Sequence, residues 1–199
     1  MNLPNKLTIL RILLVPIMVI IPYLNIQGDF LDIPISFLIM ELIFIIASIT
    51  DKLDGTIARK RNLVTTFGKF LDPIADKILV LAALIILVEL GKIPGWIPII
   101  VLFREFVVSG YRLIAVGNSG KVIAASIWGK LKTVTQMIAI ILAFIDIGTF
   151  FEFTKGTLSS WHLVVNALMS IMMIVSVIAA IFSGYDYVKD GKDLLRSGM

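Results

Sequence analysis

The feature that most constrains this chain is a succession of six long apolar stretches within 199 residues. Each is about as long as a helix needs to cross roughly 30 Å of hydrocarbon, and a backbone in lipid must satisfy its own hydrogen bonds. The sequence therefore predicts an all-α, polytopic membrane protein with six transmembrane helices. The expected spans are about Leu7–Leu24, Ile33–Thr50 with a helical extension, Phe70–Leu90, Ile93–Ala115, Leu131–Ile147 and Leu158–Gly184.

The composition supports a bilayer protein and excludes several kinds of chemistry. Hydrophobic residues make up 58% of the chain and charged residues 16%, whereas an ordinary soluble domain carries about 25% charge. No cysteine is present, which excludes disulfides, thiolate catalysis and a cysteine-bound zinc. The net charge is +4, but most basic residues flank apolar stretches, so we expect contact with anionic lipid and no nucleic-acid partner.

The distribution of basic residues predicts the orientation of the spans. Connections on one side carry only Lys92 and Lys155. The opposite connections and both termini are richer in positive charge, which places them in the cytoplasm. Asn2–Arg11 resembles an interfacial lead-in in which Pro4 and Asn5 start a helix. No cleavage site follows the first apolar run, and no linker divides the chain, so we expect one domain over residues 1–199.

Four carboxylates gather at the cytoplasmic end of two spans. Asp51 and Asp54 are three residues apart, and Asp72 and Asp76 are four apart, so each pair lies on one face of its own helix. Carboxylates this close repel one another and are costly beside a bilayer unless a cation compensates them. Hard divalent metals prefer oxygen ligands. The sequence therefore predicts a metal site at these four residues.

The full pattern around these carboxylates is D-x2-D-G-x2-A-R-x8-G-x3-D-x3-D, from Asp51 to Asp76. It resembles the signature of the CDP-alcohol phosphatidyltransferase family at every defined position. The resemblance implies an integral membrane enzyme that releases CMP from a CDP-linked lipid with a pair of divalent metals, Mg²⁺ or Mn²⁺. It also implies that all four aspartates are metal ligands, that Asp76 is in addition the general base, and that the protein is a homodimer.

Family resemblance also assigns residues to CDP-diacylglycerol. The small side chains of the motif would let the nucleotide approach closely, and the guanidinium of Arg59 suits a phosphate. The first helix contributes polar residues that could cover the nucleotide or the metals. The expected CDP-lipid residues are Gly55, Ala58, Arg59, Gly68, Asn5, Thr8 and Arg11.

Four other stretches are similar to family members whose acceptor is sn-glycerol 3-phosphate. They are P-N-K-L-T-I-L-R from Pro4, R-E-F-V-V-S-G-Y-R from Arg104, W-G-K-L-K-T-V-T-Q from Trp128 and S-G-Y-D-Y from Ser183. The expected products are phosphatidylglycerol phosphate and CMP. A dianionic acceptor needs several cationic donors near the metals. The candidates for its phosphate are Arg112, Lys130, Lys132 and Lys60.

Several other charged, aromatic and methionine residues are predicted to have structural roles. Arg104 and Glu105 lie within the fourth span, where unpaired charge is costly, so we expect them to pair with each other or with Glu41. His162 is predicted to pack at the outer interface. The tryptophans Trp96, Trp128 and Trp161 are expected in interfacial belts, and Met169, Met172 and Met173 are expected to pack or to face lipid.

Simpler interpretations stay open beside these. Small residues alone favour tight helix packing, and Lys60, Arg112, Lys130 and Lys132 could be anchors at the membrane surface. Within the family, inositol phosphate, serine or phosphatidylglycerol are alternative acceptors. Membrane prenyltransferases also use Asp-rich motifs but lack this Gly and Ala-Arg pattern. A cation carrier is the non-enzymatic alternative.

Overall fold

Six helices make up most of the computed structural model, which describes residues 3–60, 66–119 and 126–190. The side chains of residues 3–5, 51–60, 66–70, 72, 73, 113–119, 160 and 190 lie outside this description. The helices are α1 (Leu3–Ile20), α2 (Ile35–Lys60), α3 (Thr66–Glu89), α4 (Trp96–Ser119), α5 (Ile127–Ile145) and α6 (Ser160–Asp190). Short 3₁₀ helices, η1 (Ile21–Leu24) and η2 (Glu152–Lys155), follow α1 and α5.

Three of the described helices are long and apolar enough to cross a membrane. These segments are Lys6–Leu24, Ile127–Ile145 and Trp161–Lys189, and α2 contains a shorter apolar run at Ile35–Thr50. Their length and composition confirm the prediction of a helical membrane protein, because about 20 apolar residues span the hydrocarbon core.

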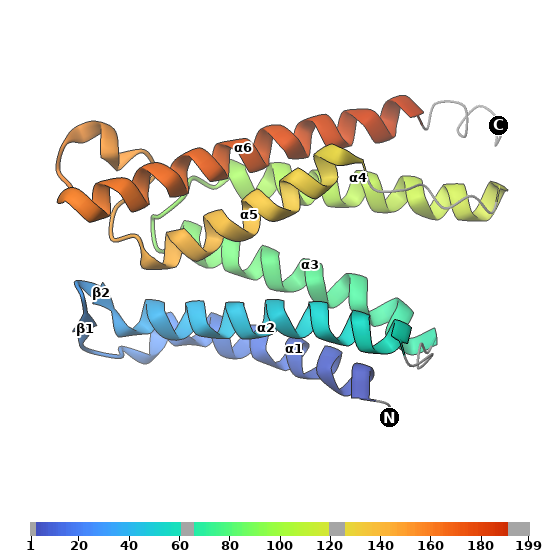
Figure 1. Ribbon diagram of the computed structural model, residues 1–199, viewed down its shortest axis with the longest axis horizontal. Helices are drawn as coiled ribbons and strands as arrows, with labels where there is room; N and C mark the ends of the chain where they lie inside the picture. Colours follow the sequence, from blue (N-terminus) through green and yellow to red (C-terminus); the bar gives the residue numbers. More distant parts are fainter. Residues whose placement is uncertain (1–2, 61–65, 120–125, 191–199) are drawn as a thin grey trace.

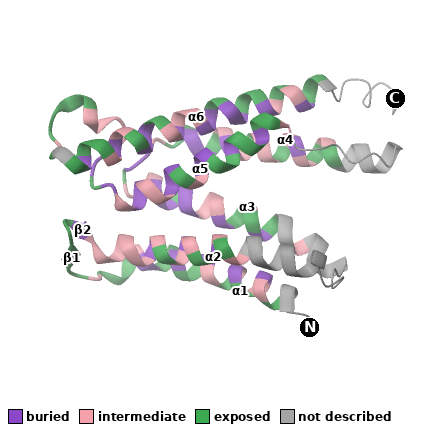
Figure 2. Ribbon diagram, viewed as in Figure 1, coloured by how far each residue is buried: buried purple, intermediate pink, exposed green. Residues whose placement is uncertain are grey.

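The helices pack lengthwise into one bundle (Figure 1). α1 lies against α2 and α3, α6 lies against α5 and α4, and α2 contacts α5 between these groups. Apolar side chains along the contacting faces are buried, while many on the outer faces are exposed (Figure 2). Phe44 of α2 meets Phe144 of α5 with ring centroids 6.4 Å apart. Met169 and Met173 of α6 are fully buried in the same core, so these two methionines pack rather than face lipid.

The bundle has two distinct ends. α1 begins and α6 finishes at one end, where α2 also ends and α3 begins (Figure 1). We call it the motif end, because the Asp51–Asp76 pattern lies there. The opposite end carries a two-stranded hairpin, the connection from α3 to α4 and the connection from α5 to α6. We call this the hairpin end.

The structure differs from the sequence prediction in several local features. The chain is not purely α-helical, because β1 (Asp29–Phe30) pairs antiparallel with β2 (Ile33–Pro34). The helix start predicted at Pro4 and Asn5 is confirmed, since α1 begins at Leu3, but the expected lead-in is continuous with the first span as far as Ile20. α5 starts four residues earlier than predicted, because the Ser126 side chain accepts a hydrogen bond from the Gly129 N–H and caps the helix.

Candidate functional site

The two pairs of motif aspartates lie on two neighbouring helices. Asp51 and Asp54 fall in the last part of α2, and Asp72 and Asp76 in the first part of α3. The helical spacing that the sequence predicted is therefore confirmed for both pairs. α2 contacts α3, so the backbone brings all four positions to the motif end. Of these four side chains, only that of Asp76 is described.

Several predicted site residues fall outside the described side chains. They are Asn5, Lys60, Asp51, Asp54, Gly55, Ala58, Arg59, Gly68 and Asp72. Among the side chains that are described, no three His, Asp or Glu residues cluster closely enough to hold a metal ion. Helix placement is therefore what the structure contributes to the predicted metal site.

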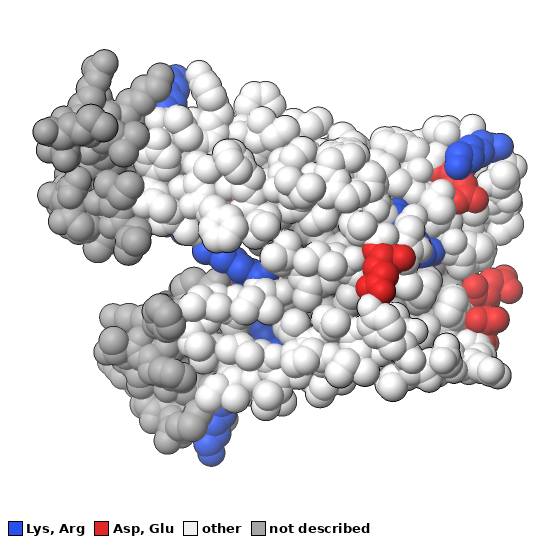
Figure 3. All heavy atoms as spheres, turned by 180° about the vertical axis from the view of Figure 1, so that it is seen from behind, with Lys and Arg blue, Asp and Glu red and all other residues white. Residues whose placement is uncertain are grey.

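Asp76 borders a cavity of about 590 Å³ that lies between α3, α4 and α5. The wall of this cavity combines apolar side chains with a polar group from each of the three helices. Lys and Arg atoms gather in the hollow on this face of the molecule (Figure 3). The polar lining residues are Asp76, Lys77, Arg104, Glu105, Ser109, Arg112, Lys132, Thr133 and Gln136.

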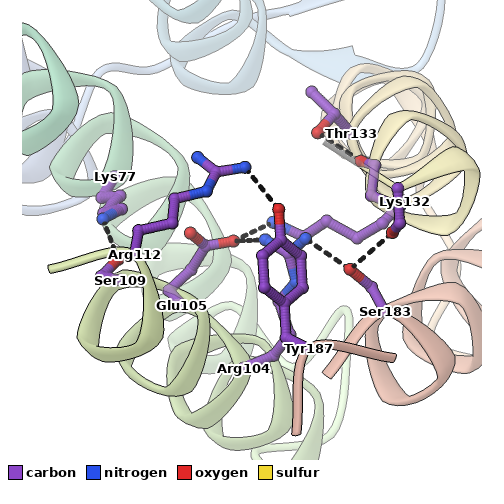
Figure 4. A network of polar contacts seen from close by, with 11 residues as sticks. Lys77, Arg104, Glu105, Ser109, Arg112, Lys132, Thr133, Ser183 and Tyr187 are labelled. Atoms are coloured by element: carbon purple, nitrogen blue, oxygen red, sulfur yellow. Dashed lines mark hydrogen bonds and ion pairs between the residues drawn. The ribbon is translucent and has the colours of Figure 1, made fainter. Parts of the chain in front are cut away.

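Glu105 is the centre of an ion-pair network in this wall. Its Oε1 accepts hydrogen bonds from Arg104 Nη1 at 2.8 Å and from Lys132 Nζ at 2.7 Å (Figure 4). The predicted pairing of Arg104 with Glu105 is confirmed, whereas Glu41 takes no part in the network formed by the described residues. Lys132 is buried inside α5, which agrees with the predicted span Leu131–Ile147.

Ser183 extends this network to α6. Its Oγ accepts a hydrogen bond from Arg104 Nη2 at 2.6 Å and lies 3.4 Å from Ser126 Oγ. Gly129 of α5 permits this arrangement, since a Cβ there would be only 3.0 Å from Arg104 Nη2. A larger residue would push the guanidinium away from Ser183. The packing of α4, α5 and α6 therefore fixes where the Arg104 side chain lies.

Two further cations in the wall contact hydroxyl groups instead of carboxylates. Lys77 Nζ of α3 donates to Ser109 Oγ of α4 at 2.6 Å. Arg112 Nη2 donates to Tyr187 Oη of α6 at 2.7 Å, and its guanidinium carbon lies 5.4 Å from the centroid of the same ring. Figure 4 shows Lys77 and Arg112 on the same side of the network.

Of the four predicted acceptor residues, Arg112 and Lys132 line the cavity together. Lys130 is exposed on α5 and is absent from the described lining. Thr8 and Arg11 are buried on α1, which contacts both α2 and α3. The sequence prediction missed Lys77, Ser183 and Tyr187. For the last two, the S-G-Y-D-Y pattern was a usable signal.

The aromatic residues are divided between the two ends. Trp128 starts α5 at the motif end and stacks on Phe182, with centroids 4.9 Å apart. Trp96 and Trp161 lie at the hairpin end, and all three tryptophans are partly exposed. His162 is buried there, with Nε2 4.0 Å from Asp32 Oδ2. Its position far from Asp76 agrees with the predicted packing role.

Comparison with known proteins decides the family. The sequence model for CDP-alcohol phosphatidyltransferase matches residues 1–182. The chain belongs to the CDP-alcohol phosphatidyltransferase family. The match extends well beyond the 26-residue Asp51–Asp76 motif and includes all helices that line the cavity. Dependence on a divalent metal is general among CDP-alcohol phosphatidyltransferases.

Several curated CDP-alcohol phosphatidyltransferases are similar along most of the chain. A CDP-diacylglycerol–glycerol-3-phosphate 3-phosphatidyltransferase of Bacillus subtilis is 51% identical over 144 residues, covering 70% of this chain and 74% of the relative. An enzyme of the same name from Rickettsia bellii is 37% identical over 190 residues, covering 94% of each chain. A probable phosphatidylglycerophosphate synthase of Mycobacterium tuberculosis is 37% identical over 187 residues, covering 94% of this chain and 80% of the relative.

Proposed function

We propose that this protein transfers the phosphatidyl group from CDP-diacylglycerol to sn-glycerol 3-phosphate, giving phosphatidylglycerol phosphate and CMP. The names of its relatives support this reaction. The structural observation that carries the proposal is the cavity beside Asp76. Among the described side chains, its lining holds four that are cationic, Lys77, Arg104, Arg112 and Lys132, and two carboxylates, Asp76 and Glu105. Such an excess of positive charge suits a phosphorylated acceptor.

Asp51, Asp54, Asp72 and Asp76 are the proposed ligands of two divalent cations, Mg²⁺ or Mn²⁺. The donor set fits, because carboxylate oxygens are preferred ligands of both ions. Helix placement supports the site as well, since α2 and α3 contact each other and carry the two pairs at the same end. When bound, the cations supply electrostatic stabilisation of charge on the phosphoryl oxygens and on the leaving phosphate.

The remaining motif residues hold the donor lipid in this proposal. Gly55, Ala58 and Gly68 leave room for the CDP group, and Arg59 donates to a phosphate. α1 completes the donor site with Asn5, Thr8 and Arg11. The burial of Thr8 and Arg11 on α1, which contacts both motif helices, supports this assignment.

Asp76 serves as the general base. The acceptor hydroxyl gives its proton to the Asp76 carboxylate while its oxygen forms a bond to the lipid-side phosphorus of the pyrophosphate. The bond from that phosphorus to the bridging oxygen breaks, and CMP leaves with the bridging oxygen and its electron pair. The exposure of Asp76 to the basic cavity supports this role, because a base must come within hydrogen-bond reach of the hydroxyl.

The acceptor phosphate binds in the same cavity. Arg112 and Lys132 belong to its wall, which supports a direct contact for Arg112 and, because Lys132 donates to Glu105, a contribution of positive charge without a direct contact for Lys132. Lys130 lies on the exposed side of α5, so for Lys130 and Lys60 the proposal rests on the sequence alone. Thr133 and Gln136 add neutral hydrogen-bonding groups to the lining, which suit the hydroxyls of a glycerol backbone.

The proposed topology has six spans, α1–α6, in a single domain over residues 1–199. The motif end and both termini face the cytoplasm, where the soluble acceptor is available. The concentration of basic residues in the connections of this end supports the orientation. Family resemblance suggests a homodimer in the bacterial cell membrane.

CMP release by purified protein in detergent tests the function. The assay contains CDP-diacylglycerol and Mg²⁺ and compares sn-glycerol 3-phosphate with inositol phosphate, serine and phosphatidylglycerol. Release with sn-glycerol 3-phosphate alone is the expected result. Preference for another acceptor would replace the proposed substrate but keep the reaction class. Absence of metal-dependent CMP release from folded protein would contradict the enzyme and favour a cation carrier.

A further inference from the structure

The four cations of the cavity wall are of two kinds. Arg104 Nη1 and Lys132 Nζ both donate to the same oxygen of Glu105, at 2.8 Å and 2.7 Å. Arg104 also donates to Ser183. The positive charges of Arg104 and Lys132 are therefore partly compensated by the Glu105 carboxylate, which lowers the attraction of both side chains for an anion.

Lys77 and Arg112 differ because their partners are neutral. Lys77 donates to the Ser109 hydroxyl at 2.6 Å and Arg112 to the Tyr187 hydroxyl at 2.7 Å. Within the described residues, no carboxylate forms an ion pair with either side chain. An ammonium group has three N–H donors and a guanidinium has five. Both residues therefore keep positive charge and donors for a ligand in the cavity.

Both cations are tied to the same turn of α4. Ser109 and Arg112 are three residues apart on α4, so they share one face of the helix and are separated by about 4.5 Å along its axis. Because the Lys77 ammonium is hydrogen-bonded to Ser109, it lies beside the turn of α4 that carries Arg112, whose guanidinium extends toward Tyr187. Figure 4 shows this arrangement, with Lys77 reaching α4 from the neighbouring helix.

We infer that Lys77 and Arg112 together bind the phosphate of the acceptor, and that Tyr187 positions Arg112 for it. The inference rests on the proposed function and adds Lys77 to the residues that contact the acceptor. A planar guanidinium can bind two phosphate oxygens, while an ammonium adds a compact charge. The Tyr187 hydroxyl and ring hold the guanidinium before the ligand arrives. Asp76, which borders the same cavity, then faces the acceptor hydroxyl.

Steady-state kinetics of Lys77→Ala in the full-length protein test the assignment. The KM for sn-glycerol 3-phosphate should rise about tenfold to a hundredfold, as expected for loss of a hydrogen bond between charged groups. The KM for CDP-diacylglycerol should stay within about twofold, because Lys77 binds only the acceptor. Lys189→Ala is the matched control. It removes the same charge from an exposed site on α6 at the motif end and should leave both values unchanged.

Conservative variants separate binding from a general structural effect. Lys77→Arg keeps the charge and should restore most of the acceptor affinity. Tyr187→Phe removes only the hydroxyl and should raise the acceptor KM about threefold to tenfold. In an Arg112→Ala background, Tyr187→Phe should have a smaller effect on the acceptor KM than in wild type, because Tyr187 positions Arg112. Tyr185→Phe is the control, since Tyr185 is exposed on the same helix.

Inorganic phosphate supplies a second readout with the same proteins. Phosphate should inhibit wild-type competitively against sn-glycerol 3-phosphate, and its inhibition constant should rise in Lys77→Ala in parallel with the KM. Wild-type acceptor KM in Lys77→Ala, or equal changes for both substrates, would overturn the inference while wild-type still makes phosphatidylglycerol phosphate. If the wild-type protein uses only an acceptor without phosphate, the proposed function fails and this inference fails with it.

Discussion

The two ends of the bundle both bury charged side chains, but those side chains meet different partners. At the hairpin end, the Lys92 ammonium donates to the backbone carbonyl oxygens of Asp146 and Gly148. The two carboxylate oxygens of Asp146 accept from the Gly148 N–H at 3.0 Å and from Asn166 Nδ2 at 2.6 Å. Burial lowers the pKa of Lys92 and raises the pKa of Asp146. These bonds join the connection after α5 to α6 and to the connection between α3 and α4.

At the motif end, only some of the charged side chains in the cavity wall have a charged partner within the protein. Glu105 accepts from Arg104 and Lys132, but Lys77 and Arg112 contact hydroxyls and border a cavity. A glycine makes room for a side chain in each region, Gly129 beside Arg104 and Gly148 beside Asn166. A glycine beside a polar side chain therefore occurs both in the structural network of the hairpin end and in the cavity wall of the motif end. A network of internally bonded groups stabilises the fold, whereas cations with neutral partners remain available to an anionic ligand.

Removal of the proposed base should have the largest effect. We expect Asp76→Asn to lower kcat about a thousandfold or more, because a general base contributes roughly two to four orders of magnitude and the same residue is a proposed metal ligand. Thermal unfolding should change little, since Asp76 is exposed to the cavity. CMP release measures the loss. Asp29→Asn, in the exposed β1 strand, is the control. Retention of full activity in Asp76→Asn would remove this residue from the mechanism.

Disruption of the hairpin-end network should affect stability instead of catalysis. Asp146→Ala removes the carboxylate acceptor of the Gly148 N–H and of Asn166 Nδ2 in a buried site, together with the negative charge near Lys92, which should lower the free energy of unfolding by about 2–4 kcal/mol. The KM values for both substrates should stay at wild-type levels in the protein that remains folded. Thermal unfolding in detergent and steady-state kinetics measure the two effects. A selective rise in the acceptor KM would contradict the division between the ends.

Lys132→Met tests whether the two kinds of cation at the motif end differ. Methionine is similar in length but carries no charge, so Glu105 keeps only Arg104 as its ion-pair partner. We expect a loss of about 1–3 kcal/mol in unfolding free energy and an acceptor KM within about threefold of wild type. Comparison with Lys77→Ala in the same assay is the measurement. If Lys132→Met raised the acceptor KM as much as Lys77→Ala does, Lys132 would contact the ligand despite its ion pair with Glu105.

Hydropathy predicted the positions of the helices well, because the distribution of apolar residues along a chain reports its burial in lipid directly. The predicted Ile93–Ala115 corresponds to α4, and the predicted Leu158–Gly184 to α6. The start of α5 was missed because Lys130 interrupts the apolar run, while the Ser126 cap sets the boundary. The hairpin was missed because Leu31 and Asp32 form its turn with positive φ, where Asn-Gly would be the usual signal.

The motif predicted which helices carry the candidate site, but the cavity wall required the three-dimensional structure. Regular spacing brings Asp72 and Asp76 onto one helix face, so that relation was available from sequence. Lys77 is held by a hydrogen bond to Ser109, which is 32 residues away in the sequence. Arg112 is held by a hydrogen bond to Tyr187, which is 75 residues away. Such pairings depend on how α3, α4 and α6 pack. Residue spacing within one helix carries no information about them.

The smallest expected effect concerns Glu152 in the connection between α5 and α6. Its Oε2 accepts from the Thr149 N–H at 2.6 Å and from Thr149 Oγ1 at 2.8 Å, and these bonds hold the pKa of Glu152 below its usual value. A lowered pKa in the folded state stabilises the protein above the usual glutamate pKa, and this contribution disappears as the pH falls through the lowered value. Glu152→Gln should therefore reduce Tm by about 1 °C at neutral pH.

The same substitution should have no effect on Tm at a pH below the lowered pKa, because wild-type Glu152 is then also uncharged. Thermal unfolding across this pH range, with Asp29→Asn as the exposed control, measures the difference. Catalytic constants at neutral pH should be unchanged, since Glu152 belongs to the hairpin end. A Tm difference that persists at acidic pH would assign the effect to hydrogen-bond geometry rather than to charge. A change in the acceptor KM would instead show that the two ends are coupled through α5 and α6, whose helices run from one end to the other.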